Sequence, residues 1–264
     1  MPMSPEQAAI AFLTPKRDLG WQFPALPGLQ RQALELPGGK LNYWRAGVGP
    51  TVLLVHGWEG TPLDLLGFAE ALLRQGRSVV FIELPAHGGS SIPWTSVPHA
   101  AHALRRLGDA LGPVEGVVAH SVGGALATLA MAQGLRAARV ALISAPAQYR
   151  VYASGFARAM GLDEPTARGM VEHLMTQFGI DVRRVSTPDA ARRLDAPALI
   201  VHSSDDSVVS VSDGEAIAAA WQGARLQRVE GLGHRRILAS TEVVSTVCHF
   251  LLDPAPAQAG ALVA

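Results

Sequence analysis

Residues 114–124, Val-Glu-Gly-Val-Val-Ala-His-Ser-Val-Gly-Gly, carry the pattern that decides the fold. The stretch opens on a short apolar run, which is typical of a buried strand, and apolar residues at helical spacing follow at 125–134. A strand and a helix joined by a tight turn with serine at its tip form a nucleophile elbow. The turn is sharp, so only small residues fit two positions before and after Ser121, where Ala119 and Gly123 stand. The hydroxyl would lie at the helix N-terminus, where the dipole and free N–H groups favour negative charge.

The same alternation of apolar runs and helical patterns continues on both sides of the elbow. Strands are predicted at 51–55, 78–82, 114–119, 140–143, 198–202 and 226–229, and helices at 63–75, 97–111, 125–134, 214–221 and 237–252. Strands that are apolar throughout and alternate with helices are typical of a parallel sheet buried on both faces. We therefore expect an α/β fold, with a mostly parallel central sheet flanked by helices. A Gly-rich loop between 34–36 and 41–45 predicts a hairpin before it.

The alternation of predicted strands and helices is interrupted once. Residues 146–194 hold no convincing strand but carry apolar residues at helical spacing, so we predict a small helical cap inserted there. The core of the fold then comprises residues 32–145 and 195–252. Residues 1–31 are expected to form an N-terminal extension with one short helix at 5–13, and residues 253–264 a disordered tail.

The composition limits the class of protein. The chain has 264 residues, with 22 Lys and Arg against 22 Asp and Glu, and 48% of its residues are hydrophobic. Balanced charge argues against a nucleic-acid partner, and the hydrophobic content suffices for a large core. The single cysteine, Cys248, allows neither an intrachain disulfide nor a cysteine-based zinc site.

Two segments could be taken for membrane signals. Residues 116–135 are uncharged over a spanning length, but their glycines, His120 and Ser121 favour a strand, a turn and a helix. The N-terminus has no basic region, and its apolar stretch is too short for a signal peptide. We expect a cytoplasmic protein that acts on a small molecule, with no membrane span, no metal and no cofactor. The sequence leaves the oligomeric state open.

Three residues in chain order supply the groups that nucleophilic catalysis needs. A serine hydroxyl is a weak nucleophile and needs a base to take its proton. Ser121 is followed by Asp206, after the strand at 198–202, and by His234, after the strand at 226–229. Loops at strand exits are where such sheets place their sites. We predict Ser121 as the nucleophile, His234 as the base and Asp206 as the acid that orients it, with Asp205 as the alternative acid.

A fourth stretch, Leu-Val-His-Gly-Trp-Glu-Gly at 54–60, lies where the chain leaves the early strand. Acyl chemistry develops an oxyanion, which two backbone N–H groups can stabilise. The N–H groups of Trp58 and Val122 are the candidates for this oxyanion hole. The alternative interpretation is an ordinary glycine turn with a packed tryptophan.

Together these stretches resemble the α/β-hydrolase fold superfamily, among its serine esterase-like members with a helical cap. The matching pieces are His56-Gly57-Trp58, Leu84-Pro-Ala-His-Gly-Gly-Ser90, His120-Ser-Val-Gly-Gly124, the Asp206 loop and Gly233-His234, within residues 32–252. The resemblance implies the triad and oxyanion roles given above. It favours Asp206 over Asp205, because the acid is usually followed by one residue and then two aliphatic ones. A serine at the elbow argues against the aspartate-nucleophile branches, the haloalkane dehalogenases and epoxide hydrolases.

Hydrolysis of a small carboxylic ester or thioester through an acyl-enzyme is the activity we predict first. An apolar cap would suit an uncharged acyl group, and Phe156, Met160, Leu174 and Phe178 are the candidates to line its pocket. The same triad also serves amide or peptide cleavage, C–C hydrolysis and acyl transfer, so the fold cannot choose between them. A non-catalytic ligand-binding protein on this fold is the remaining alternative.

Overall fold

The computed structural model describes residues 3–253. Its strands are β1 (Gln30–Leu36), β2 (Gly39–Ala46), β3 (Thr51–Val55), β4 (Ser78–Ile82), β5 (Val114–His120), β6 (Ala137–Ile143), β7 (Ala198–Ser203) and β8 (Arg225–Val229). Its α-helices are α1 (Pro5–Leu13), α2 (Leu66–Arg74), α3 (Val97–Leu111), α4 (Val122–Ala132), α5 (Tyr149–Ala159), α6 (Glu164–Phe178), α7 (Thr187–Ala191), α8 (Val211–Ala220), α9 (Gly233–Arg236) and α10 (Thr241–Leu252). Short 3-10 helices, Pro62–Leu65 and Ile237–Ala239, lie before α2 and α10.

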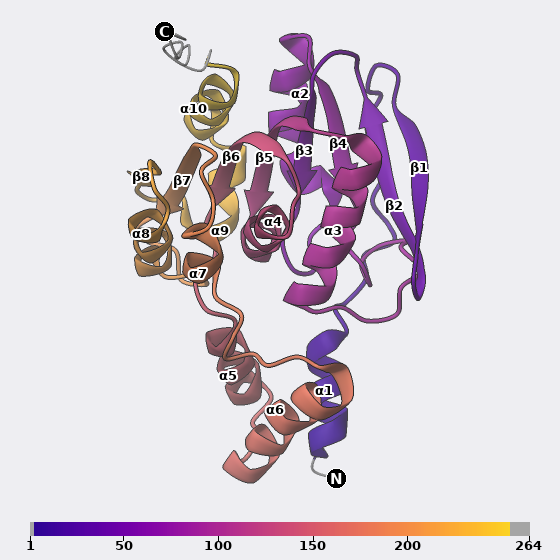
Figure 1. The fold of residues 1–264 in the computed structure, drawn as a ribbon, viewed down its shortest axis with the longest axis vertical. Helices are drawn as coiled ribbons and strands as arrows, with labels where there is room; N and C mark the ends of the chain where they lie inside the picture. The colour runs from indigo at the N-terminus through magenta and orange to yellow at the C-terminus, as the bar shows by residue number, and fades with distance from the viewer. Residues whose placement is uncertain (1–2, 254–264) are drawn as a thin grey trace, which may run out of the picture.

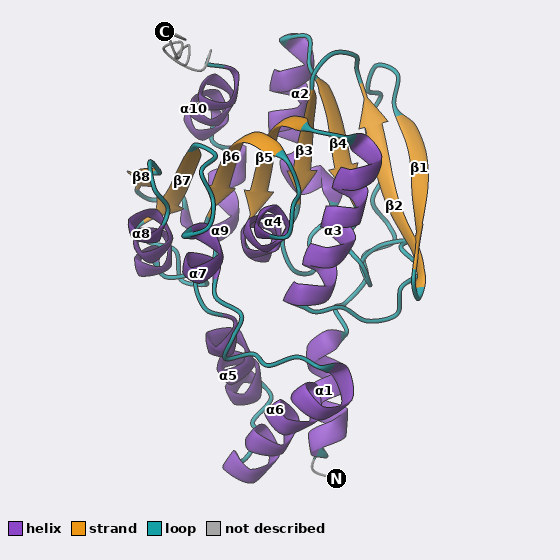
Figure 2. Ribbon diagram, viewed as in Figure 1, coloured by secondary structure: helices purple, strands orange, loops and turns teal. Residues whose placement is uncertain are grey.

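The strands form one sheet in the order β1-β2-β4-β3-β5-β6-β7-β8. The hairpin of β1 and β2 is antiparallel, and β2 pairs antiparallel with β4. The remaining pairs, from β4 to β8, are parallel. The predicted α/β fold with a mostly parallel sheet and flanking helices is confirmed (Figure 2).

The continuous apolar runs are explained by burial of the sheet on both faces. Alternate side chains of a strand point to opposite faces. In β3, Leu53 and Val55 pack in the half of the core that holds α3 and α4. Val52 and Leu54 pack in the other half, with α2 and α10. One strand therefore contributes to both halves of the core, which requires apolar residues at every position.

Of the predicted core helices, only that at 97–111 has the bounds expected, and α4 and α10 show physical reasons for a difference. Helix α4 starts at Val122 rather than at residue 125. Its first turn includes Gly123 and Gly124, although glycine is a poor helix former. The predicted helix at 237–252 is divided, because a 3-10 turn ends at Ala239 and the Ser240 side chain accepts a hydrogen bond from Val243 N–H to start α10.

The cap is built from α5 and α6 together with the N-terminal helix α1. Figure 1 shows these three helices beyond the end toward which the parallel strands point. Phe12 of α1 lies against Tyr149 and Phe156 of α5, with ring centroids 5.5 and 5.3 Å apart. The helical cap is therefore present as predicted, but it includes a helix that sequence analysis had assigned to a separate extension.

The segment between α1 and β1 also packs on the core. The Arg17 guanidinium donates hydrogen bonds to the carbonyl oxygens of Ser90 (3.0 Å) and Ile92 (2.8 Å). Phe23 packs against Trp44 and Phe81, with ring centroids 5.6 and 4.8 Å apart. This segment thus fastens the loop after β4 to the rest of the domain.

Within residues 3–253, no helix combines the length and the apolar character needed to cross a membrane. The uncharged stretch at 116–135 is divided between β5 and α4. Of the tail predicted to be disordered, all but Asp253 lies outside the described residues.

Candidate active site

Ser121 stands at the tip of a strained turn between β5 and α4. Its φ of 54° and ψ of −130° are unfavourable for a residue with a side chain. The turn is held because Ser121 N–H donates to the Ile143 carbonyl at 2.9 Å. It is possible because Gly123 has no side chain: a Cβ there would come within 2.6 Å of two backbone oxygens, those of Val55 and His56. A steric clash therefore explains why the elbow requires a small residue at position 123, as the sequence predicted.

The structure brings the three predicted triad residues into one line. His234 Nε2 lies 3.0 Å from Ser121 Oγ, and His234 Nδ1 lies 2.8 Å from Asp206 Oδ2. Ser121 and Asp206 are both buried, with 8% and 9% of their surfaces exposed. In this geometry a neutral His234 donates its Nδ1–H to Asp206 and accepts the Ser121 hydroxyl proton at Nε2.

The two neighbouring acids take different places. Asp206 Oδ1 accepts the N–H groups of Val208 and Val209, both at 2.9 Å, which leaves Oδ2 for His234. Burial alone would raise the pKa of Asp206, but these hydrogen bonds outweigh it and hold the pKa at about 2. Asp205 instead accepts Gly233 N–H at 3.1 Å and the Ser203 hydroxyl. The geometry thus places Asp206 against the histidine, and Asp205 anchors the histidine loop.

Of the candidate oxyanion donors, Val122 directly follows Ser121, and Trp58 lies in the turn after β3. Val122 is the first residue of α4, so its N–H has no partner inside the helix. Neither the Val122 nor the Trp58 N–H donates to another group in the described part of the chain. Their role as an oxyanion hole stays a prediction.

Two buried neutral histidines shape the loop that carries Trp58. His87 Nε2 accepts Glu59 N–H at 3.0 Å, and its Nδ1 donates to the Pro85 carbonyl at 2.9 Å. His56 Nε2 likewise accepts Leu84 N–H at 3.2 Å. Burial lowers the pKa of His56 to about 3 and that of His87 to about 4. Glu59 has a positive φ of 53°, which is unfavourable for a residue with a side chain. The hydrogen bonds of the two neutral histidines help to hold the loop in this conformation.

The four predicted pocket residues have differing surroundings in the cap. Leu174 is fully buried, whereas Met160 is 45% exposed. Phe156 packs on Phe12, and Phe178 packs on Trp94 of the loop after β4, with ring centroids 5.1 Å apart. Their role as a pocket lining stays a prediction.

Sequence analysis did not single out Tyr152, a half-buried residue of the cap helix α5. Burial raises the pKa of Tyr152, and the negative charges of Asp213 and Asp206 raise it further. The hydroxyl therefore lies within electrostatic reach of the triad acid. The sequence held no signal for this proximity beyond a tyrosine in a predicted cap helix.

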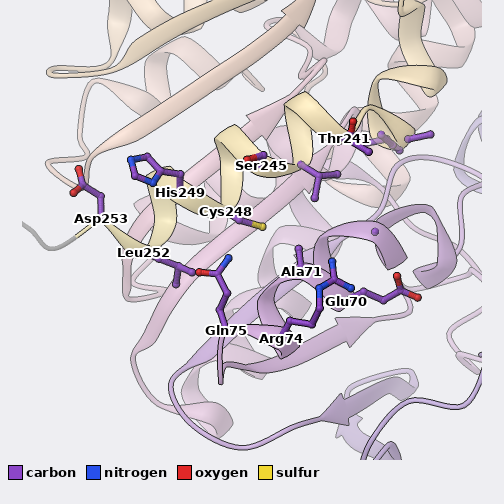
Figure 3. A pocket seen from close by; sticks show the side chains of 14 residues that line it. Glu70, Ala71, Arg74, Gln75, Thr241, Ser245, Cys248, His249, Leu252 and Asp253 are labelled. Atoms are coloured by element: carbon purple, nitrogen blue, oxygen red, sulfur yellow. The ribbon is translucent and has the colours of Figure 1, made fainter.

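A groove of about 700 Å³ lies elsewhere, between α2 and α10 (Figure 3). Its lining includes Glu70, Arg74, Cys248 and His249 but none of the triad residues. Burial raises the pKa of the Cys248 thiol to about 11, which makes it unreactive. Among residues 3–253, no three His, Cys, Asp or Glu side chains are grouped so that they could hold a metal ion.

Comparison with known proteins agrees with the fold. Residues 52–246 match the family model described as the alpha/beta hydrolase family. A dihydrolipoyllysine-residue acetyltransferase component of the acetoin cleaving system from Cupriavidus necator is 33% identical over 184 residues, which cover 66% of this chain and 48% of that protein. The chain thus spans about half the length of this curated relative.

Solved structures resemble most of the chain. A putative lipase from Acinetobacter baumannii has a TM-score of 0.65 at 22% identity, covering 85% of this chain and 91% of its own. An esterase from Exiguobacterium antarcticum has a TM-score of 0.65 at 18% identity, covering 82% and 97%. Est816, described as an N-acyl homoserine lactone degrading enzyme, has a TM-score of 0.66 at 19% identity, covering 83% and 100%. At these identities the likeness is one of fold.

Proposed function

Because the chain belongs to the alpha/beta hydrolase family, we propose that it is a serine hydrolase that cleaves a small carboxylic ester or thioester through an acyl-enzyme. The observation that carries the proposal is the line of hydrogen bonds from Ser121 Oγ through His234 to Asp206. A serine in a strained turn, in contact with a base that is itself oriented by a buried carboxylate, is the arrangement that nucleophilic catalysis requires.

In the first half of the reaction, Ser121 Oγ attacks the carbonyl carbon while its proton passes to His234 Nε2. The Asp206 carboxylate, ionised above pH 2, stabilises the imidazolium that results. The oxyanion accepts hydrogen bonds from the N–H groups of Trp58 and Val122. When the tetrahedral intermediate collapses, His234 returns the proton to the leaving alcohol or thiol, and the acyl group stays on Ser121.

In the second half, water replaces the leaving group. His234 takes a proton from the water, the hydroxyl attacks the acyl carbon, and Ser121 leaves with the proton that His234 returns. The side chains we propose for the acyl pocket are Phe156, Met160, Leu174 and Phe178, since apolar cap residues suit an uncharged acyl group. A cytoplasmic location and catalysis without a cofactor are part of the same proposal.

A chain-length series of p-nitrophenyl esters tests the proposal. The wild-type protein should hydrolyse short to medium esters with a burst of p-nitrophenol, because acylation releases the phenol before water attacks. Ser121→Ala should stay folded and lose turnover by about a thousandfold or more. Ester turnover that survives this substitution would contradict the proposal. A folded wild type without turnover would favour the amide, C–C or ligand-binding alternatives.

Acyl transfer is a second candidate, since the 33% identical relative is described as an acetyltransferase component. In this reaction a thiol or alcohol, rather than water, would attack the acyl group on Ser121. The test is the partition of a p-nitrophenyl acetate acyl group between water and an added dithiol. Product dominated by the acyl-thiol at millimolar acceptor would favour transfer, and free acetate alone would favour hydrolysis.

A further inference from the structure

Two buried histidines outside the triad contact the loops that carry its base and its acid. His120 ends β5, and His202 lies near the end of β7. We propose that His120 and His202 are positioning residues, which fix the His234 loop and the Asp206 loop, respectively, by donating a hydrogen bond to a carbonyl of each loop. The catalytic meaning of this inference rests on the proposed function.

His202 acts on the acid through one intervening residue. Its Nε2 lies 3.0 Å from the Val209 carbonyl oxygen, while Val209 N–H donates to Asp206 Oδ1 at 2.9 Å. Val209 is therefore held on one side by the imidazole and itself holds the carboxylate. The same Nε2 lies 3.6 Å from Asp206 Oδ2, the oxygen that binds His234. Because 2.8 Å separates that oxygen from His234, a small shift of the loop would break the triad contact.

The fit around His202 shows that its ring position is fixed. The side chain is fully buried. A Cβ at Gly214 of α8 would come within 2.6 Å of its Nδ1, so glycine allows this helix to pack directly on the ring. The imidazole is thereby confined between the helix and the acid loop, which leaves it one orientation toward Val209.

His120 holds the base in the same way. Its Nε2 lies 2.9 Å from the backbone carbonyl oxygen of His234, and the two rings are tilted with centroids 4.8 Å apart. His120 precedes Ser121, so a single rigid strand end positions both the nucleophile and the backbone of its base. Burial, with a contribution from nearby His234, lowers the pKa of His120 to about 4 and keeps it neutral.

Both imidazoles donate from Nε2 and leave the same nitrogen unpaired. A carbonyl oxygen only accepts, so Nε2 carries the hydrogen in each ring. The other nitrogen, Nδ1, is buried and has no hydrogen-bond partner among the described residues. An unpaired buried nitrogen costs free energy, which an apolar residue of similar size would avoid. Space filling therefore does not explain these histidines, and the N–H donated to each loop does.

Substitution of each histidine by glutamine and by methionine distinguishes the loss of the hydrogen-bond donor from the change in side-chain shape. Glutamine and methionine have similar length, but only glutamine can donate from the position of Nε2. We expect His202→Met and His120→Met to lower kcat for a p-nitrophenyl ester by about tenfold or more, with KM nearly unchanged. The matching His202→Gln and His120→Gln should recover most of the loss. His99→Met, at a half-buried histidine of α3, is the control and should leave kcat unchanged.

A second readout does not depend on turnover. The proton shared by His234 Nδ1 and Asp206 should give a far-downfield proton NMR signal in the wild type, because it lies in a short charge-assisted hydrogen bond. The methionine variants should broaden or lose this signal, and the glutamine variants should keep it. Near-ultraviolet circular dichroism tests whether each variant is folded. If a methionine variant fails to fold, the glutamine variant is compared instead with the asparagine variant at the same position. The shorter asparagine amide cannot reach the carbonyl oxygen.

The outcomes distinguish the two proposals. Wild-type protein that shows the downfield signal but no turnover of any ester would contradict the proposed function and leave the positioning role intact. Active wild type whose folded methionine variants keep full kcat and an unchanged signal would overturn the positioning role. Methionine and glutamine variants that lose kcat equally would also overturn it, because the donated hydrogen would then have no effect.

Discussion

Three buried histidines that stay neutral should make the fold unstable in acid. Burial lowers the pKa of His56 to about 3 and the pKa values of His87 and His120 to about 4, from an ordinary value of 6.5. At a pH between the folded and the unfolded pKa values, these histidines bind protons in the unfolded chain but not in the folded chain. The contribution of these histidines to the free energy of unfolding is therefore nearly constant above pH 7 and falls as the pH drops from 6.5 toward 4. At pH 5 each histidine costs about 2 kcal/mol, and the three together about 6 kcal/mol.

That loss is comparable to the whole stability of an ordinary domain, about 5–15 kcal/mol. Buried carboxyl groups with raised pKa values, such as Glu83, act in the opposite direction. A comparison with a variant isolates the histidine contribution. His87→Gln removes one titrating ring, while the amide oxygen can still accept Glu59 N–H. His102→Gln, at an exposed position of α3, is the control.

Urea unfolding at pH 7.5, 6 and 5 measures the effect. His87→Gln should be less stable than wild type at pH 7.5, but the difference should shrink by about 2 kcal/mol at pH 5. The control should follow the wild-type pH dependence. A stability difference between His87→Gln and wild type that does not change with pH would refute the reasoning, because His87 would then titrate equally in both states.

Further predictions concern the acids, the elbow and the cap. Asp206→Asn should lower kcat by about a thousandfold or more and Asp205→Asn by less than about tenfold, because only Asp206 touches the base; equal losses in ester kinetics would contradict this. Gly123→Ala should lower Tm and abolish ester turnover, since its Cβ would meet two backbone oxygens within 2.6 Å, whereas Gly155→Ala, inside α5 with no atom within 4 Å, should keep turnover and not lower Tm. Phe12→Ala should destabilise the protein by about 3 kcal/mol or more in urea unfolding, because Phe12 is buried between α1 and α5; an unchanged midpoint would mean that α1 does not stabilise the cap.

The sheet could be predicted from the sequence because buried parallel strands are apolar at every position. The runs at 51–55 and 78–82 coincide with β3 and β4, and β7 extends the predicted strand by one residue. Local pattern also located the elbow and placed Ser121, Asp206 and His234 at strand ends. The structure then shows that Asp206, rather than Asp205, contacts the histidine.

The remaining features depend on contacts between distant segments. Helix α1 was predicted, but its place in the cap depends on aromatic packing against α5, which no local pattern records. His202 lies in an apolar strand, so it does not stand out until the acid loop folds against it. The first turn of α4 was missed because glycine propensity opposes a helix there, and the elbow overrides it.

Labelling with a fluorophosphonate, followed by peptide mapping, tests the central claim most directly. The reagent reacts only with a serine whose proton can be taken by a base and whose adduct an oxyanion hole can stabilise. The account predicts that wild-type protein is labelled on Ser121 alone and that folded Ser121→Ala is not labelled. A folded wild-type protein that stays unlabelled, or that is labelled on another serine, would contradict it.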